Sequence, residues 1–149
     1  MMNLILFLIV NVVFCYMATV GFGVILNIPR RGLNACGIVG VIGWLVYVCI
    51  KDCFSSSMLA NLLAAFSIGM GAMFCARFKK MPMILFNIPS LVPLVPGGQA
   101  YRAVRYFAIG KNDLALSDLD QVGLLAGSLA VGFFWAEFVS VVYFKSRGD

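Results

Sequence analysis

Histidine is absent from this sequence of 149 residues, and charged residues make up only 11% of it. The missing imidazole removes the side chain that most often serves as a general acid or base or binds a metal near neutral pH. The HExxH and GxSxG motifs and a Walker phosphate loop are absent as well. The sequence therefore gives no support to a hydrolytic or phosphoryl-transfer enzyme, and we expect no catalytic residues, no cofactor and no metal site.

The five cysteines lack the spacing of a metal site or of a redox pair. None of them forms a CxxC motif, and all lie inside or beside apolar runs, at Cys15, Cys36, Cys49, Cys53 and Cys75. Free cysteine in such surroundings behaves as a small hydrophobic residue. We therefore expect reduced thiols here.

Long apolar runs dominate what is present. Hydrophobic residues make up 62% of the chain and the mean hydropathy is +1.00, whereas a soluble domain is about half apolar and about one quarter charged. The predicted fold class is all-α, a polytopic membrane protein of about five transmembrane helices in a single transmembrane domain, residues 1–149. The predicted helices cover residues 3–26, 33–50, 54–76, 81–108 and 121–144, and each can span a hydrocarbon core of about 30 Å.

The basic residues predict an orientation in the membrane. If all five helices cross, one side holds the seven residues Arg30, Arg31, Arg77, Lys79, Lys80, Lys145 and Arg147. The other side holds Lys51 and Lys111, with Arg102 and Arg105 at most. The positive-inside rule then places the N-terminus outside and the C-terminus inside. The same rule accounts for the net charge of +5, so we expect no nucleic-acid partner.

Small residues recur at spacings that bring them to one side of a helix. They are Gly37, Gly40 and Gly43 in the second predicted helix, Ser67 and Gly71 in the third, and Gly123 and Gly127 in the fifth. Such residues allow close helix packing in lipid. The alternative is that glycine is simply common in membrane helices.

The stretch FNIPSLVPLVPGGQAYRAVRYF interrupts the fourth predicted helix near residues 92–98. Pro89, Pro93 and Pro96 remove backbone donors, and Gly97 and Gly98 follow directly. Non-helical backbone at membrane depth is tolerated only where protein or a watery cavity surrounds it. About ten residues precede the break, roughly 15 Å of helix, so we expect the break and a polar cavity near mid-membrane.

A second half-helix over residues 98–109 would complete the crossing and present its positive N-terminus to this cavity. Such a terminus can bind an anion, and Gln99, Arg102 and Arg105 follow one another on one side of it. Transporters use discontinuous helices in this way for substrate carboxylates. Alternatively, the two arginines extend to the interface and the prolines only kink the helix.

Glu137 is the other polar residue that stands out within a predicted span. It lies seven residues before Phe144, about 10 Å from the end of the last predicted helix. A carboxyl group at this depth faces a cavity, pairs with a cation or is protonated. Glu137 is therefore a candidate for proton coupling or a partner of Arg102 or Arg105, and the alternative is an interfacial residue.

Two blocks of sequence resemble the threonine/serine exporter family (ThrE-like), in particular its small-subunit, YjjB type. They are GFGVILNIPRRGLNACGIVGVIG and IPSLVPLVPGGQAYRAV. The second block contains the Pro-x-x-Pro-Gly of Pro93, Pro96 and Gly97, together with Tyr101. The resemblance extends over nearly the whole chain.

The resemblance implies export of threonine and serine, or of a dicarboxylate such as succinate, across the bacterial cytoplasmic membrane. It also implies a larger ThrE/YjjP-like membrane subunit as partner, in a homo- or hetero-oligomer. The candidate substrate-binding residues are Pro93, Pro96, Gly97, Gly98, Gln99, Tyr101, Arg102 and Arg105, with Glu137 for proton coupling. The alternative function is a structural or scaffold membrane subunit that supports a larger substrate-binding partner.

Overall fold

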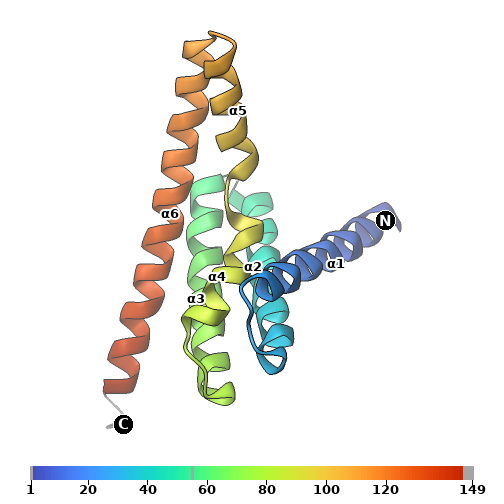
Figure 1. Cartoon of the computed structure of the whole chain (residues 1–149), viewed down its shortest axis with the longest axis vertical. Coiled ribbons are helices and arrows are strands. Elements are labelled where there is room, and N and C mark those ends of the chain that lie inside the picture. Colours follow the sequence, from blue (N-terminus) through green and yellow to red (C-terminus); the bar gives the residue numbers. More distant parts are fainter. Residues whose placement is uncertain (1, 55, 146–149) are drawn as a thin grey trace.

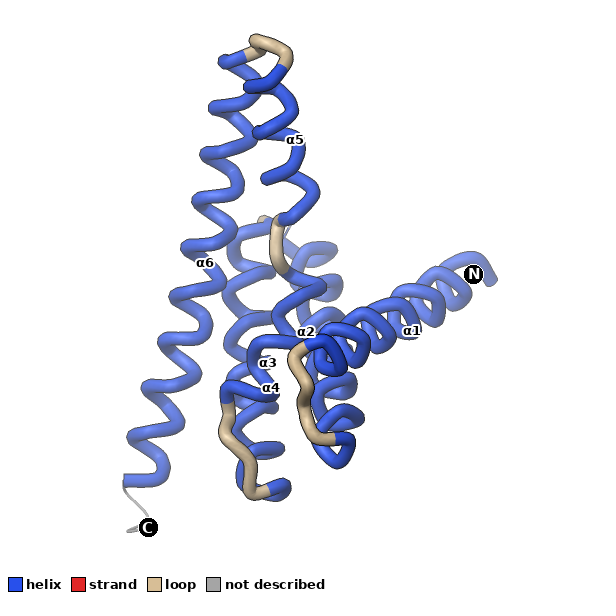
Figure 2. The backbone as a smooth tube through the Cα atoms, in the orientation of Figure 1, coloured by secondary structure: helices blue, strands red, loops and turns tan. Residues whose placement is uncertain are grey.

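The computed structural model describes residues 2–54 and 56–145, and all regular structure in this part of the chain is helical (Figures 1 and 2). Its elements are α1 (Met2–Ile25), α2 (Arg30–Phe54), α3 (Ser57–Lys79), α4 (Ile84–Leu91), the short 3-10 helix η1 (Val92–Leu94), α5 (Gly97–Ala108) and α6 (Asn112–Lys145). The predicted all-α fold is confirmed. The fourth predicted helix is interrupted, as expected, and is divided into α4, η1 and α5.

Three helices are long and apolar enough to cross a membrane. They are α2, α3 and the Asn112–Tyr143 part of α6. The first and fourth predicted spans are represented by shorter apolar helical stretches, Ile9–Ile25 and Ile84–Leu94. The chain is therefore a helical membrane protein, and three of its helices meet this criterion within the described residues.

A residue with left-handed backbone caps the C-terminal end of helix α1. Asn27 has a φ of 59°, and the backbone N–H of Ile28 bonds to the carbonyl of Gly23 at 3.0 Å. This is the bonding of a Schellman cap. Because proline is favoured at the very start of a helix, Pro29 lets α2 begin at Arg30, three residues before its predicted start.

Helix α3 lies between α2 and α6, and small residues bring these helices close to it. Gly43 of α2 faces Ile68, and Gly132 of α6 lies against the backbone carbonyl of Leu62, where any added Cβ would collide. The alanines on α3 that are fully buried are Ala60, Ala64, Ala65 and Ala72. Apolar burial gives little drive for association inside lipid, so van der Waals packing of this kind holds the helices together.

Helix α1 packs on α2 with its C-terminal half and then runs away from the bundle (Figure 1). Gly37 and Gly40 of α2 lie against Tyr16 and Thr19, which confirms the packing role predicted for these glycines. Nearer the N-terminus of α1, Phe14 is 70% exposed. That side of α1 is therefore available to lipid or to another protein.

Two hydrogen bonds attach helix α4 to α2, and one of them uses a carbonyl group that the proline of α4 leaves unpaired. Pro89 has no N–H, so the carbonyl of Leu85 lacks its helical donor. The free thiol of Cys36 donates to that carbonyl at 3.4 Å, and the Ser90 hydroxyl donates to the carbonyl of Cys36 at 3.1 Å. These bonds satisfy the backbone within the bundle and fix the position of η1.

Helix α6 begins at Asn112, nine residues before its predicted start at 121. Its 34 residues measure about 51 Å at the helical rise. Figure 1 shows α5 and the first part of α6 projecting together beyond the C-terminal end of α2 and the N-terminal end of α3. That residues 98–109 complete the crossing stays a prediction, and α5 pairs with α6 in this projecting part, with Ala103 and Ala115 buried.

Candidate functional site

The break is a short run of tight and extended backbone. After η1, Val95 is extended (φ −66°, ψ 130°), and α5 begins at Gly97. The N–H of Gly97 bonds to the carbonyl of Val95 at 2.8 Å, and that of Ala100 bonds to Pro96 at 3.0 Å. In the described part of the chain no backbone acceptor is present for the N–H groups of Gly98 and Gln99. The first turn of α5 therefore keeps the free donors that can bind an anion.

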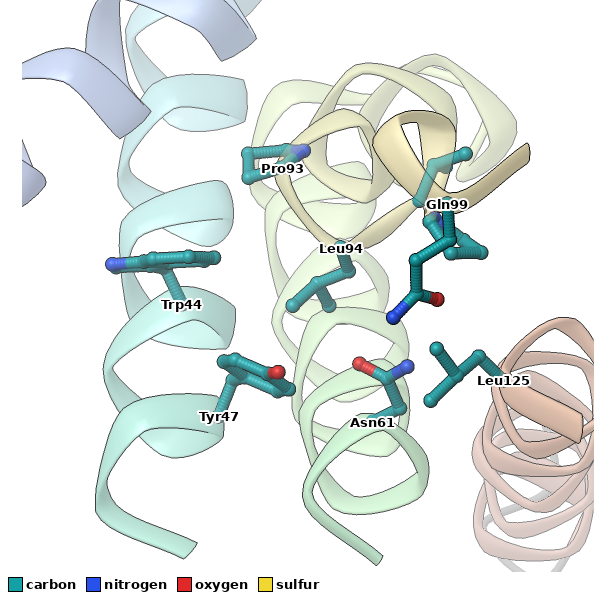
Figure 3. Close-up of a pocket in the computed structure, with 9 residues that line it drawn as sticks. Trp44, Tyr47, Asn61, Pro93, Leu94, Gln99 and Leu125 are labelled. Atoms are coloured by element: carbon teal, nitrogen blue, oxygen red, sulfur yellow. The ribbon is translucent and has the colours of Figure 1, made fainter. Parts of the chain in front are cut away.

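A cavity of about 180 Å³ lies beside this break (Figure 3). It is lined by Trp44 and Tyr47 of α2, Asn61 of α3, Pro93, Leu94, Val95, Pro96, Gln99, and Leu125 of α6. Ligand pockets for drug-sized molecules measure about 300–1,000 Å³. The cavity is thus of a size for a small metabolite.

The polar groups of the cavity are uncharged and come from three helices. The amides of Asn61 and Gln99 point toward one another across it, and the Tyr47 hydroxyl lies beside Asn61 (Figure 3). Asn61 is only 3% exposed, and Oε1 of Gln99 is buried without a hydrogen-bond partner. A buried acceptor of this kind calls for a bound water or solute, so the cavity is suited to a polar guest.

An aromatic wall closes the cavity on the side of α2. The rings of Trp44 and Tyr47 stack with centroids 5.4 Å apart, and the Lys51 amine lies 5.5 Å from the Tyr47 centroid, outside the lining. The indole nitrogen of Trp44 points away from the cavity (Figure 3). Trp44 and Pro93 also border a second cavity of about 220 Å³ that α1 lines. These two residues therefore separate two cavities.

The cavity reaches from one end of the bundle to about its middle. Trp44 lies ten residues before the end of α2, about 15 Å along the axis. Asn61 lies four residues after the start of α3, about 6 Å along that axis. The basic residues Arg30 and Lys79 stand at the opposite ends of the same two helices. The cavity therefore occupies the half of the bundle remote from the predicted cytoplasmic side.

The structure brings three of the eight predicted substrate-binding residues to the cavity, namely Pro93, Pro96 and Gln99. Gly97 and Gly98 are exposed at the start of α5, and an added Cβ at either would meet no atom within 4 Å. Tyr101, Arg102 and Arg105 are exposed along α5 and do not line the cavity.

Sequence reasoning did not identify Trp44, Tyr47 or Asn61. Asn61 had a usable signal, because an amide inside an apolar membrane helix is costly and usually functional. The two aromatic residues had none, since aromatic side chains are frequent at membrane interfaces without any ligand.

Arg102 forms an ion pair with Asp118 of α6. Its Nε lies 3.5 Å from Oδ2 of Asp118, and the two side chains are 53% and 14% exposed. That oxygen has no hydrogen bond, so the contact is electrostatic and is worth about 0–1 kcal/mol. The expectation that Arg102 pairs with Glu137 was wrong, because Glu137 lies 19 residues beyond Asp118 on α6, about 28 Å away along the axis.

Glu137 borders a different cavity, of about 170 Å³ between α4 and α6. The neighbouring Ala136 lies where a Cβ on Gly69 would collide with it, and Gly69 is close to the middle of α3. Glu137 is therefore level with the middle of α3, and it is exposed on α6 beside this cavity. An ionised carboxylate at the centre of a bilayer costs about 3 kcal/mol, which argues for a specific role or partner.

Fold and site together define a class, the polytopic membrane proteins in which a broken helix borders a small polar cavity, as in secondary transporters. The sequence model of the family described as Threonine/Serine exporter, ThrE, matches residues 11–139. The chain belongs to this family of transporters.

The chain was also compared with individual curated proteins and with solved structures. An uncharacterized protein of Haemophilus influenzae (strain Rd) is 26% identical over 98 residues, which are 65% of this chain and 33% of that protein. The match therefore spans about a third of the length of that relative. No solved structure matches this chain.

Proposed function

We propose that the chain is a small subunit of a secondary exporter of threonine and serine, and that the cavity beside the broken helix holds the substrate. Membership of the exporter family supports the class of function. The observation that carries the site is the convergence of the α5 N-terminus with the Asn61 and Gln99 amides on one uncharged cavity.

A zwitterionic amino acid matches these groups. Its carboxylate accepts hydrogen bonds from the free N–H groups of Gly98 and Gln99, where the helix dipole favours negative charge. Its ammonium group donates to the amide oxygens of Asn61 and Gln99, and the remaining amide N–H and the Tyr47 hydroxyl serve the substrate hydroxyl. The unpaired acceptor on Gln99 thus gains a donor.

A dicarboxylate such as succinate fits this lining less well. Charged side chains are absent from the lining that the structure describes, so the second carboxylate would enter without a counter-ion, which is costly. We assign Arg102 and Arg105 to attracting a carboxylate toward the α5 end of the cavity, since both are exposed along α5.

The proposed assembly includes a larger ThrE/YjjP-like membrane subunit. The matched region is only a third of the Haemophilus influenzae relative, so in that protein it is joined to further chain. The exposed apolar sides of α1 and α6 leave room for such a partner or for a second copy. We place the complex in the bacterial cytoplasmic membrane. The C-terminal ends of α1 and α3 then lie on the inner side, beside the basic residues.

A scaffold role is the second candidate, and the outward course of α1 favours it (Figure 1). In that case the larger partner holds the substrate, and this chain only supports it. Polar substitutions inside the cavity would then leave transport unchanged, whereas changes on the packing faces would dissociate the complex.

The test is efflux of labelled threonine and labelled succinate from cells that express this chain with and without the larger subunit. We expect threonine efflux only when both chains are present, and a weaker response for succinate. Equal threonine efflux without this chain would overturn the proposal. Succinate efflux without threonine efflux would overturn the assignment of substrate.

A further inference from the structure

The cavity between α4 and α6 brings together two polar side chains that the substrate site does not use. Glu137 of α6 and Asn87 of α4 both line it, and its other lining residues are the apolar Met83, Ile88, Leu91 and Phe133. Oδ1 of Asn87 is buried without a hydrogen-bond partner. The ion pair in the described part of the chain joins Arg102 to Asp118 and leaves Glu137 out.

We propose that Glu137 and Asn87 form a proton-binding site, separate from the substrate cavity, that carries the coupling proton of the exporter. This inference rests on the proposed function for its coupling role. Proton binding at the site can be measured without transport, so the two claims can fail independently.

The chemistry of the cavity selects a proton over a metal ion. Hard cations need about six oxygen ligands, whereas this lining offers one carboxylate and one amide among apolar side chains. A proton needs only the carboxylate and one hydrogen-bond partner. An anion is excluded because the Glu137 carboxylate would repel it.

Asn87 can stabilise both states of the carboxyl group. When Glu137 is protonated, its O–H donates to the unpaired Oδ1 of Asn87. When Glu137 is ionised, the Asn87 amide rotates so that its N–H donates to the carboxylate. One proton thus enters from water on one side, is held as the carboxylic acid, and leaves to the other side as the carboxylate forms again.

The ionisable groups around Glu137 are remote along their helices. The α4 segment Ile84–Leu91 contains none. On α3, Cys75 and Arg77 lie six and eight residues beyond Gly69, about 9 and 12 Å along the axis. On α6 itself, Tyr143 lies six residues farther on and Asp120 seventeen residues before. Among the described lining residues of this cavity, Asn87 is therefore the polar neighbour of the Glu137 carboxyl group.

The test compares Glu137→Gln, Glu137→Asp and Asn87→Leu with Asp120→Asn, a control carboxylate on the projecting part of α6. Infrared difference spectra of the complex in vesicles, recorded against pH, report protonated carboxyl groups. We expect a carboxylic-acid band that disappears in Glu137→Gln, shifts in Asn87→Leu and Glu137→Asp, and is unchanged in Asp120→Asn. A band unchanged in Glu137→Gln would overturn the proton site.

Transport then tests the coupling role in the same vesicles. We expect Glu137→Gln to keep threonine exchange at equal pH on both sides and to lose net transport driven by a pH gradient. Gradient-driven transport that survives in Glu137→Gln would overturn the coupling role. Absence of threonine exchange in the unaltered complex would overturn the proposed function, while the infrared result would still decide whether the site binds a proton.

Discussion

At the scale of single residues, the amide of Asn61 is the polar group most deeply enclosed in the cavity wall. It is 3% exposed and points toward Gln99 (Figure 3). Both amides can bind the two charged ends of an amino acid, and neither is engaged by a charged side chain in the described structure. Replacement of Asn61 therefore distinguishes a substrate-binding role of this chain from a scaffold role.

Asn61→Leu keeps the size of the side chain and removes both of its polar atoms. We expect efflux of threonine to fall about tenfold or more, because a lost buried hydrogen bond costs about 1–3 kcal/mol. The matched control is Ser67→Ala on the same helix, whose hydroxyl only donates to the carbonyl of Ala64 at 2.7 Å. Equal efflux in the two variants, at equal amounts in the membrane, would favour the scaffold role.

The exposed arginines of α5 give a weaker prediction. The double variant Arg102→Gln, Arg105→Gln should raise the apparent KM for external threonine in exchange by at most about fivefold, since exposed charge interactions are worth about 0–1 kcal/mol. High salt should remove the difference. Lys79→Gln, at the other end of the bundle, serves as the control. Complete loss of exchange would show that the arginines bind the substrate directly.

At the scale of helices, the sequence predicted the break well and the helix ends less well. Prolines and paired glycines act through local backbone geometry, so the interruption after Leu91 could be located from the sequence alone. The start of α6 could not. Asp113, Asp118 and Asp120 lower the hydropathy there, and the helix is completed by packing against α5, a contact that sequence alone does not show.

The packing glycines give a prediction at the same scale. Gly132 lies against the backbone carbonyl of Leu62, whereas a Cβ at Gly127 would meet no atom within 4 Å. Gly132→Val should lower the free energy of unfolding by about 1–3 kcal/mol, the usual cost of overpacking. Thermal unfolding in detergent measures the change.

Gly127→Val is the matched control on α6 and should leave unfolding nearly unchanged. If instead Gly127→Val disrupts the complex with the larger subunit while the isolated chain is unaffected, this part of α6 is an interface. Equal unfolding of Gly132→Val and the unaltered chain would contradict the packing described for α3 and α6.

At the scale of the whole molecule, one end of the bundle carries Arg30, Arg31, Arg77, Lys79 and Lys80, whereas Lys51, Arg102, Arg105 and Lys111 lie toward the opposite end. The connection from α1 to α2 and the one from α3 to α4 lie at the same end (Figure 2), and Gly32 lies against Met81 across them. The hairpin of α5 and α6 projects from the opposite end (Figure 1). The arrangement of the helices thus brings the basic residues of the α1–α2 and α3–α4 connections to one side.

This arrangement predicts the orientation of the chain. A reporter inserted at Gly110, in the turn between α5 and α6, should be active outside the cytoplasm, and one fused to the C-terminus should be active inside. Reporter activity on the same side of the membrane at both positions is expected only if α6 does not cross the membrane. Reporter activity in whole cells measures this directly.

The central claim is that the substrate lies between α2, α3, η1 and the first turn of α5. The most direct measurement is labelling of the complete complex in membranes with a photoreactive threonine analogue, followed by mass spectrometry of the adducts. The account predicts adducts on the peptides that contain Trp44, Asn61 and Gln99, and their loss when excess threonine competes. Competable adducts confined to the larger subunit, or to the cavity beside Glu137, would contradict it.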